Sequence, residues 1–502
     1  MTLLSALLDK VAQSDRPLKI LYVTAELAPL IKTGGLGDVA GALPQALHAL
    51  GHDVRVILPC YAKIPAEARG DLYCMCVANF GKFVEHGALR TSKVPGTDVP
   101  LYLVEHNGFF NRPDPYGDHG QAYPDNLRRF SFFNLAVLDG IPQTHWVPDV
   151  IHCHDWHTAP LPILLKTRHA NDPLWRNKPV LFSVHNLAYQ GRYGKDVWGD
   201  TGLDVDLFRP DALEYFGDIN LMKGAITYSD MISTVSRRHA MEIQTPEFGN
   251  GLDGALRARA RNIVGILNGV DYSQWNPETD KLIPAQYSLK DMAGKDACKR
   301  DLQTKLGLPI RKDVPVYGVV TRFDWQKGLD LLASALDDML AKDIQVVILG
   351  TGDPYFEQLF LEKAQFHGDK LRVLVKFDIG LSHEIQAASD FFLMPSHYEP
   401  SGLSQMYAMA YGSLPIARRT GGLGDSIVDA SKSNVADERA TGILFGPPRR
   451  DTLLHAFDRS LALYGQPAVF TAVQRVAMAR RYSWEQAAQT YVNLYRRTIN
   501  AA

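Results

Sequence analysis

Two glycine-rich stretches of nearly identical sequence stand almost four hundred residues apart: KTGGLGD at 32–38 and RTGGLGD at 419–425. Each follows an apolar run and precedes a segment with a helical pattern. Glycine lets a ligand approach the backbone, and the start of a helix offers unpaired N–H groups that favour an anion. Each loop could therefore hold a phosphate, although a tight strand-to-helix turn without a ligand explains either loop equally well.

Two nucleotide-binding classes that use such loops are disfavoured. Gly35, Gly37 and Ala40 fit the G-x-G-x-x-A fingerprint of dinucleotide-binding oxidoreductases, but that fingerprint needs an acidic residue at the end of the next strand. The next predicted strand ends in Pro59 and Cys60 instead. Neither loop ends in G-K-[ST], which argues against a P-loop NTPase.

Four more polar clusters follow predicted strands, which is where open α/β sheets bind their ligands. They are HCHDWH (152–157), SVHNLAYQG (183–191), TRFDWQKG (321–328) and PSHYEPSGLS (395–404).

The elements that must position these clusters are short, continuous apolar runs alternating with helical patterns. Such runs are typical of parallel strands that are buried on both faces, so we expect an α/β fold with doubly wound sheets. The predicted strands are 18–24, 53–58, 98–104, 149–153, 179–184, 231–235, 263–267, 314–321, 344–349, 371–377, 391–394 and 414–417.

Composition limits the possible partners and compartments. The 502 residues suggest several domains, and a net charge of −2 gives no global field that would select nucleic acid or a membrane. The five cysteines form no paired framework, which favours a reducing compartment, and we expect a cytoplasmic protein. Residues 1–13 lack the basic start of a signal peptide and predict a short amphipathic helix that docks on the body.

The two halves of the chain share the same pattern of apolar runs alternating with helical segments. Residues 271–294 are polar, contain prolines and show no period, so they read as a connector. We predict an N-terminal domain over 1–268, a second domain over 269–478 and a C-terminal helical segment over 479–502.

Seven motifs in order give this chain a strong resemblance to a known family. KTGGLGDV, HDWH, VHNLAYQG, LNGVD, R-x-x-x-Q-K-G, EPSGL and RRTGGL follow one another as in bacterial glycogen synthases and plant starch synthases. The resemblance implies the GT-B fold, with two Rossmann-like domains facing a deep cleft and the C-terminal helix crossing back to the first domain. It also implies retaining transfer of glucose from ADP-glucose to the non-reducing end of an α-1,4-glucan.

The resemblance assigns three catalytic groups that act on the sugar. Asp155 is implied to be a carboxylate near the transferring glucose, with His157 supporting its loop. His185 is implied to hydrogen-bond the donor sugar, although a histidine satisfied within the core is the plain alternative. Glu399 is implied to stabilise the developing positive charge rather than to act as a nucleophile.

Further residues are expected to hold the donor nucleotide. Arg322 and Lys327 could neutralise the diphosphate, unless they are a solvated surface pair, and Lys32 carries over as a third cation. Gly34 and Gly35 of the first loop would add N–H groups. The remaining candidates are Asn268 in the LNGVD connector, Phe377 at the adenine and the helix start formed by Gly402, Leu403 and Ser404.

Two departures from the family pattern leave the nucleotide preference open. Ser401 stands where bacterial relatives often have Cys, and Phe377 stands where Tyr is common, so it can stack but cannot donate a hydrogen bond. A transferase that uses UDP-glucose or a small acceptor, and a non-catalytic glucan-binding relative, remain alternatives.

No metal cofactor is expected. His152, His154 and His157, together with Asp155, resemble metal ligands at first. Residues 152 and 154 share one face of a strand, however, whereas catalytic zinc usually needs three well-placed ligands. The D-x-D pair Asp204 and Asp206 lies in a polar stretch between elements, so we interpret both as solvated or helix-capping residues.

Overall fold

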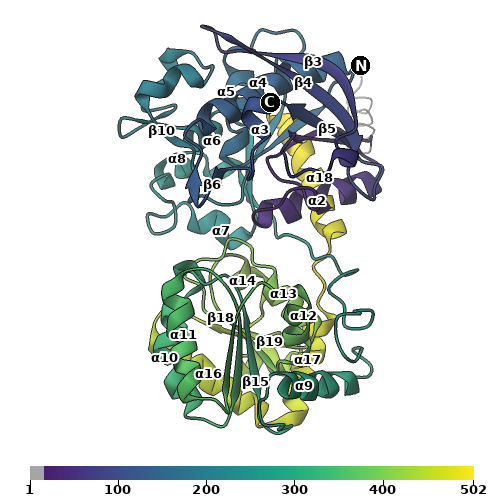
Figure 1. Ribbon diagram of the computed structural model, residues 1–502, viewed down its shortest axis with the longest axis vertical. Helices are drawn as coiled ribbons and strands as arrows, with labels where there is room; N and C mark the ends of the chain where they lie inside the picture. Colours follow the sequence, from purple (N-terminus) through teal and green to yellow (C-terminus); the bar gives the residue numbers. More distant parts are fainter. Residues whose placement is uncertain (1–15) are drawn as a thin grey trace, which may run out of the picture. The chain divides into compact units, whose positions relative to one another are not determined.

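The computed structural model describes residues 16–502 and divides the chain into two compact units (Figure 1). Unit 1 holds the described residues up to Val235, together with Ala240–Ile266 and Trp484–Ala502. Unit 2 holds Ser236–His239 and Leu267–Ser483. The sequence placed these divisions at 268/269 and 478/479. The helix predicted over 1–13 lies outside the described residues.

Unit 1 is built on a nine-stranded sheet whose first seven strands pair in parallel. Each of these seven was predicted, most of them from a continuous apolar run. In spatial order the nine strands are β14 (Ile263–Gly265), β13 (Met231–Thr234), β9 (Val180–Val184), β8 (Val150–His154), β1 (Lys19–Val23), β2 (Asp53–Pro59), β5 (Pro100–Glu105), β4 (Val84–Lys93) and β3 (Asp71–Asn79).

The strands β4 and β3 form an antiparallel hairpin at one edge of this sheet, which the sequence analysis missed. Along β3 the side chains of Cys76 and Ala78 are buried, whereas Met75 and Val77 are exposed. A strand half exposed in this way alternates instead of forming a continuous apolar run.

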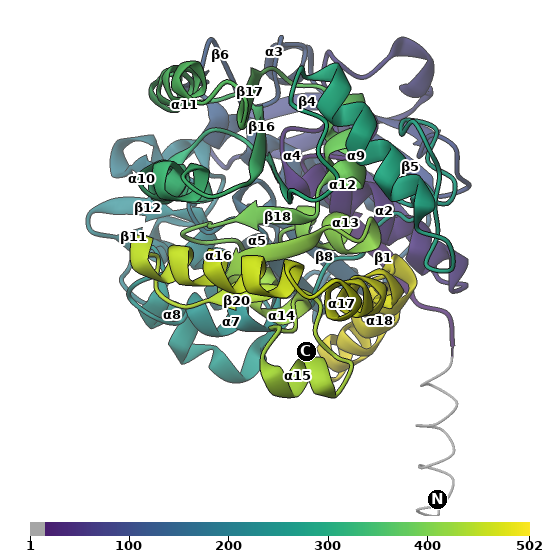
Figure 2. The same cartoon turned by 90° about the horizontal axis from the view of Figure 1, so that it is seen from below.

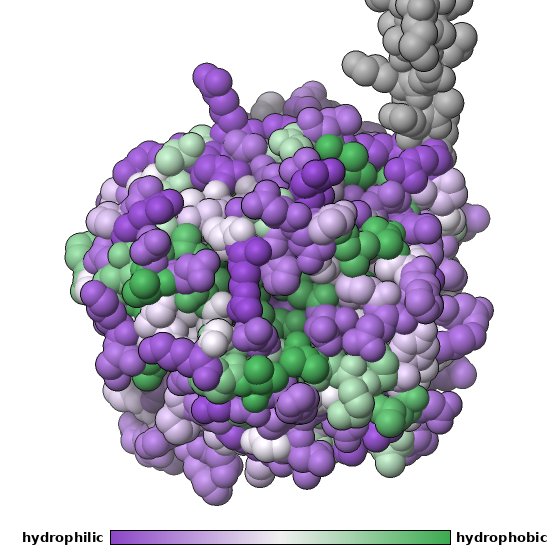
Figure 3. Space-filling model, turned by 90° about the horizontal axis from the view of Figure 1, so that it is seen from above, coloured by the Kyte–Doolittle hydropathy of each residue, from purple (hydrophilic) through white to green (hydrophobic). Residues whose placement is uncertain are grey.

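The face of the molecule in Figure 3 is mostly hydrophilic, with apolar residues in several separate groups.

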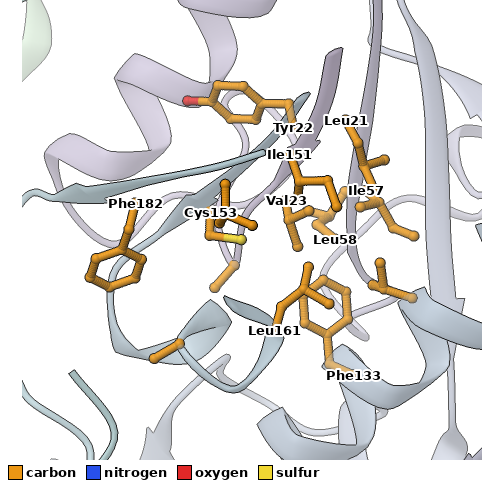
Figure 4. Close-up of a cluster of buried hydrophobic side chains, with 14 of the residues drawn as sticks. Leu21, Tyr22, Val23, Ile57, Leu58, Phe133, Ile151, Cys153, Leu161 and Phe182 are labelled. Atoms are coloured by element: carbon orange, nitrogen blue, oxygen red, sulfur yellow. The ribbon is translucent and has the colours of Figure 1, made fainter. Parts of the chain in front are cut away.

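The two faces of the parallel sheet carry different side chains (Figure 4). On one face Leu21 packs towards Phe133 of α4 (Asn126–Gln143) and Leu161 of α5 (Pro160–Lys166). Tyr22 points to the opposite face, and its register partner on β8 is His152. That opposite face is covered by α2 (Gly35–Ala49) and α18 (Trp484–Ala501), so it receives the C-terminal helix.

Short elements complete unit 1. They are η1 (Ala66–Ala68), α3 (Asn107–Phe110), β6 (Gly117–Asp118), β7 (Gln121–Ala122), η2 (Trp156–Thr158), β10 (Arg192–Gly194), η3 (Lys195–Asp200), η4 (Val205–Leu207), β11 (Glu214–Tyr215), β12 (Asp218–Asn220), α6 (Leu221–Tyr228), α7 (Arg237–Glu242), α8 (Asp253–Ala258) and η5 (Ala260–Asn262). The helix α7 begins within Ser236–His239, the short segment that belongs to unit 2.

Unit 2 is built on a six-stranded sheet that is parallel throughout. Five of its strands were predicted, and the short β20 was not. In spatial order they are β17 (Leu371–Val375), β16 (Gln345–Gly350), β15 (Val316–Val320), β18 (Phe391–Met394), β19 (Leu414–Arg418) and β20 (Ile443–Phe445).

Helices cover both faces of this second sheet, with α10 and α11 on one side and α9, α12 and α13 on the other (Figures 1 and 2). The helical elements of unit 2 are α9 (Ala293–Lys305), η6 (Trp325–Lys327), α10 (Leu329–Leu340), α11 (Pro354–Phe366), α12 (Ile379–Ala388), α13 (Ser404–Ala410), α14 (Gly421–Ser426), α15 (Lys432–Ala436), α16 (Arg450–Tyr464) and α17 (Pro467–Ala479). No helix in residues 16–502 combines the length and apolar character needed to cross a membrane.

The segment interpreted as a connector is part of unit 2 rather than a free linker. The ring of Trp275 stacks between those of His383, at 3.8 Å, and Tyr407, at 3.9 Å. Ile283 and Tyr287 are buried in the same region. The segment resembles a linker because its few large apolar residues are spaced without a period, yet Trp275, Ile283 and Tyr287 pack on the unit.

Candidate active site

Asp155 stands directly after β8 with an unusual backbone. Its φ of 54° and ψ of −179° lie in a region that is essentially restricted to glycine. Its side chain is buried, and Oδ1 accepts hydrogen bonds from the N–H groups of His185, at 2.7 Å, and Asn186, at 3.4 Å. Strain of this kind collects at functional sites, so the geometry marks Asp155 as a candidate catalytic group.

Burial raises the pKa of Asp155 to about 7, even though the N–H donors of His185 and Asn186 act in the opposite direction. The carboxylate of Glu26 adds a smaller upward contribution to this pKa. A carboxyl group whose pKa lies near 7 can exchange a proton at neutral pH.

His185 follows β9, and its ring Nε2 lies 2.9 Å from Nδ1 of His154. Burial lowers the pKa of His185 to about 4, so its ring is neutral at pH 7. His157 stacks on Tyr116, with ring centroids 4.5 Å apart, and its backbone carbonyl accepts from Nδ2 of Asn134 at 2.8 Å. His154 and Asp155 thus stand at the end of β8 and His185 at the end of the neighbouring β9, while His157 lies in η2.

In the first glycine loop the N–H groups of Gly34 and its neighbour Thr33 are not open for a phosphate, which corrects the expectation for the N–H of Gly34. Their two N–H groups donate to Oε2 of Glu26, at 3.0 and 2.7 Å. Glu26 is buried, and its Oε1 accepts from the hydroxyl of Tyr116 at 2.9 Å. This loop is therefore organised around an anion that the chain supplies itself.

Lys32 precedes that loop and lies at the surface of unit 1. Its Nζ is 2.7 Å from Oδ1 of Asp38, and half of its side chain is exposed. A cation that is paired only at the surface is free to exchange its partner for a ligand. Gly35, the first residue of α2, lies beside it with open space at its Cα.

In unit 2 the partly buried pair formed by Lys327 and Glu399 is the centre of the candidate site. Lys327 Nζ lies 2.7 Å from Oε2 of Glu399, which also accepts from the hydroxyl of Ser396 at 3.2 Å. The pair lines a cavity of about 60 Å³ together with Gly402, Leu403 and Ser404. The structure thus brings five of the predicted residues to one place.

The loop that carries Lys327 is fixed at both ends. Asp324 caps η6 by accepting from the N–H of Lys327 at 3.0 Å. Gly328 ends η6 with a φ of 68°, and a Cβ there would come within 2.1 Å of the carbonyl oxygen of Pro395. Trp325 stacks on His397 at 4.2 Å, which ties this loop to the segment that carries Glu399.

In the second glycine loop the N–H of Gly422 supports the segment that carries Glu399, so this N–H is not open for a phosphate. The N–H of Gly422 donates to the carbonyl oxygen of Glu399 at 3.0 Å. A Cβ on Gly421 would lie 2.0 Å from that same oxygen, and one on Gly422 would lie 1.7 Å from the carbonyl oxygen of Ser401. Only glycine permits so close an approach of two backbones.

Three predicted residues are not joined to the Lys327–Glu399 pair by any contact found in the described chain. The side chain of Arg322 is 72% exposed and lies 3.4 Å from Oδ2 of Asp324. Phe377, in the loop after β17, is 86% exposed. Asn268 is buried, and its Oδ1 has no hydrogen-bond partner within residues 16–502.

Comparison with known proteins places this geometry in a family. Residues 19–258 match the starch synthase catalytic domain, and residues 304–472 match the glycosyl transferases of group 1. Glycogen synthase of Syntrophotalea carbinolica is 42% identical over 484 residues, 96% of this chain and 99% of that protein. Glycogen synthase of Myxococcus xanthus is 43% identical over 480 residues, 95% of this chain and 99% of that protein.

The chain belongs to the glycogen and starch synthase family.

Solved structures agree with this family and with its GT-B fold. The catalytic domain of starch synthase IV from Arabidopsis thaliana, bound to ADP and acarbose, superposes with a TM-score of 0.85 at 36% identity, covering 97% of this chain and 100% of that one. Sucrose-phosphate synthase from Thermosynechococcus elongatus shares the fold at 19% identity, with a TM-score of 0.58 over 97% of this chain. The glycosyltransferase class predicted from the motifs is confirmed.

Two functional candidates of this glycogen synthase family member escaped the sequence analysis. Glu26 organises the first glycine loop. The sequence signal that could have identified it is a lone carboxylate inside the apolar stretch TAELAPLI. His154 contacts His185. The only sequence signal for His154 was that residues 152 and 154 share one face of a strand.

The D-x-D pair of this family member is exposed. Asp204 and Asp206 stand at the start of η4 with their side chains in solvent. In residues 16–502 no group of three or more His, Cys, Asp or Glu side chains is arranged to hold a metal ion.

Proposed function

We propose that this chain elongates glycogen by retaining transfer of glucose from ADP-glucose to the non-reducing end of an α-1,4-glucan. The observation that carries the proposal is the partly buried Lys327–Glu399 pair in a chain whose relatives are glycogen synthases. The ADP and acarbose bound to starch synthase IV support a nucleotide donor and a glucan acceptor.

Each charged group of the proposed mechanism has a distinct task. Lys327 would turn from Glu399 to the departing diphosphate, and the exposed Arg322 and Lys32 would add charge-assisted hydrogen bonds. Glu399 would then face the positive charge that develops at the anomeric carbon. A carboxylate fixed beforehand by Ser396 and the Gly422 loop stabilises that charge without having to reorganise.

In unit 1, Asp155 and His185 would bind the sugar. Asp155 holds the backbone of His185 in place, and the neutral ring of His185 can hydrogen-bond a sugar hydroxyl. Gly34 and Gly35 would shape the loop that carries Lys32, while Phe377, Asn268 and the segment Gly402–Ser404 would contact the nucleotide.

We further propose that the transfer needs no metal ion, because three lysine and arginine side chains can neutralise a diphosphate. Glucan elongation should therefore survive excess EDTA. The variant Asp204→Asn/Asp206→Asn should be as active as the unmodified chain, because both carboxylates are exposed. Loss of activity in EDTA that manganese restores would reject this part of the proposal.

The proposed compartment is the cytoplasm, and the proposed partners are small molecules and glucan. All five cysteines are free thiols, as expected in a reducing compartment. The near-neutral net charge supports neither nucleic acid nor a membrane surface as a partner.

Nucleotide release from the purified chain tests the donor and the reaction together. ADP-glucose and UDP-glucose would be supplied separately, with and without glycogen, and the Lys327→Met variant would report contaminating activity. We expect glycogen-dependent ADP release with kcat/KM at least about tenfold above that for UDP-glucose. A preference for UDP-glucose would reject the donor, and no release from either would indicate a glucan-binding relative.

A further inference from the structure

His154 is a buried histidine to which the proposed mechanism gives no task. It is the last residue of β8, and its Nδ1 lies 2.9 Å from Nε2 of His185. One of these two nitrogens must donate and the other accept, because each neutral imidazole carries a single N–H.

The surroundings of His154 hold its ring in one orientation. The ring packs against those of His152, with centroids 3.9 Å apart, and Tyr22, at 4.1 Å, and these two rings also contact each other. The hydroxyl of Thr158 accepts from the N–H of His154 at 2.6 Å and lies 3.0 Å from its carbonyl oxygen, which fixes the backbone. A buried ring that packs against two neighbouring rings on a fixed backbone can serve as a rigid partner for the ring of His185.

The second ring nitrogen of His154 decides which way the hydrogen bond runs. Its Nε2 is buried and has no partner within residues 16–502. A proton on Nε2 would leave a buried N–H group unpaired, and such orphaned donors are rarer in proteins than unpaired acceptors. The proton therefore belongs on Nδ1, from which it points at His185.

We propose that His154 is a positioning residue that donates from Nδ1 to Nε2 of His185, so that His185 presents an N–H at Nδ1 to an oxygen of the sugar substrate. The inference rests on the proposed function, because it assigns the ligand of His185 to a sugar. Burial lowers the pKa of both histidines, so each ring carries one proton at neutral pH and the direction of the bond is defined.

The protonation of the rings can be observed without substrate. In the full chain labelled with ring ¹⁵N histidine, nitrogen shifts and one-bond N–H couplings report which nitrogen carries the proton. The His154→Asn and His185→Asn spectra identify the signals. We expect His185 to be protonated at Nδ1 and not at Nε2. Protonation at Nε2 would overturn the proposal even if the chain proves to be a glycogen synthase.

Two amide variants test the effect on turnover. The amide of Asn overlies Nδ1 of a histidine and the amide of Gln overlies Nε2, so only His154→Asn can still donate to His185. We expect His154→Asn to keep kcat within about threefold and His154→Gln to lose about 10–100-fold, with smaller changes in KM. Equal losses in both variants, or in neither, would show that His154 serves packing alone.

Discussion

Lys327 Nζ and Glu399 Oε2 form an ion pair of 2.7 Å in which the side chains are only 20% and 8% exposed. The two residues are 72 positions apart, and the ends of β15 and β18 bring them together because these strands are neighbours in the sheet. Each charge is balanced before a ligand arrives. A diphosphate that draws Lys327 away would leave Glu399 free to face positive charge on the sugar.

The charge of Glu399 can be removed while its shape is kept. We expect Glu399→Gln to lower kcat by about 10²–10³, because the carboxylate acts mainly on charge that develops in the transition state. The KM for ADP-glucose should change much less. Initial rates at saturating glycogen measure both constants, and the exposed Glu278→Gln is the matched control. Nearly normal turnover would assign Glu399 to packing.

The stability of the pair should be non-additive. Lys327→Met leaves the buried carboxylate of Glu399 without its cation, so the free energy of unfolding should fall by about 1–3 kcal/mol. Adding Glu399→Gln to that variant removes the unpaired charge and should restore part of the loss. Urea unfolding of the two single variants and the double variant measures the coupling. A double variant less stable than Lys327→Met would contradict it.

The raised pKa of Asp155 predicts a pH-dependent cost to stability. Its pKa is about 7 in the folded chain against 3.8 for an ordinary aspartate. Between these values the folded state binds more protons than the unfolded state, so this contribution to stability falls as pH rises from 4 to 7. We expect the thermal midpoint of Asp155→Asn to equal the unmodified chain's near pH 4 and to exceed it by a few degrees at pH 8.

Differential scanning calorimetry across this range checks the prediction for Asp155. The exposed Asp204→Asn is the matched control. A difference for Asp155→Asn that stays constant with pH would mean that Asp155 has an ordinary pKa. Activity of Asp155→Asn should be low at every pH, because the ionised carboxylate is lost.

Glu26→Gln should loosen the first glycine loop. One amide oxygen cannot replace two carboxylate oxygens that receive two N–H groups and a hydroxyl. We expect the KM for ADP-glucose to rise about tenfold as Lys32 loses its fixed position. Loss of the neighbouring negative charge should also lower the pKa of Asp155 and move the pH–rate midpoint downwards. An unchanged KM together with an unchanged pH profile would refute both effects.

The sequence predicted the parallel core because strands such as 391–394 are continuous apolar runs, and it located the polar clusters at the strand ends. It did not predict the β3–β4 hairpin, whose Cys, Ala and Met residues alternate without a strong apolar signal. The positive φ of Asp155 could not be predicted, because the residue type at this position does not indicate it. The second glycine loop contacts a backbone 22 positions away, and only the strand order reveals that contact.

The glycine loops show most clearly what residue types alone leave open. Both sequences offer N–H groups at the start of a helix, and the expectation of a phosphate followed from that chemistry. Which acceptor occupies the donors depends on the tertiary fold, and here the acceptors are Glu26 in unit 1 and the carbonyl oxygens of Glu399 and Pro400 in unit 2.

The linkage formed in the product tests the central claim most directly. The purified chain would transfer radiolabelled glucose from ADP-glucose to glycogen, and the washed polymer would be digested with β-amylase, which cleaves α-1,4 bonds from the non-reducing end. The account predicts that nearly all of the label is released as maltose. Label that resists β-amylase, or that appears in a small molecule instead of glycogen, would contradict retaining α-1,4 elongation.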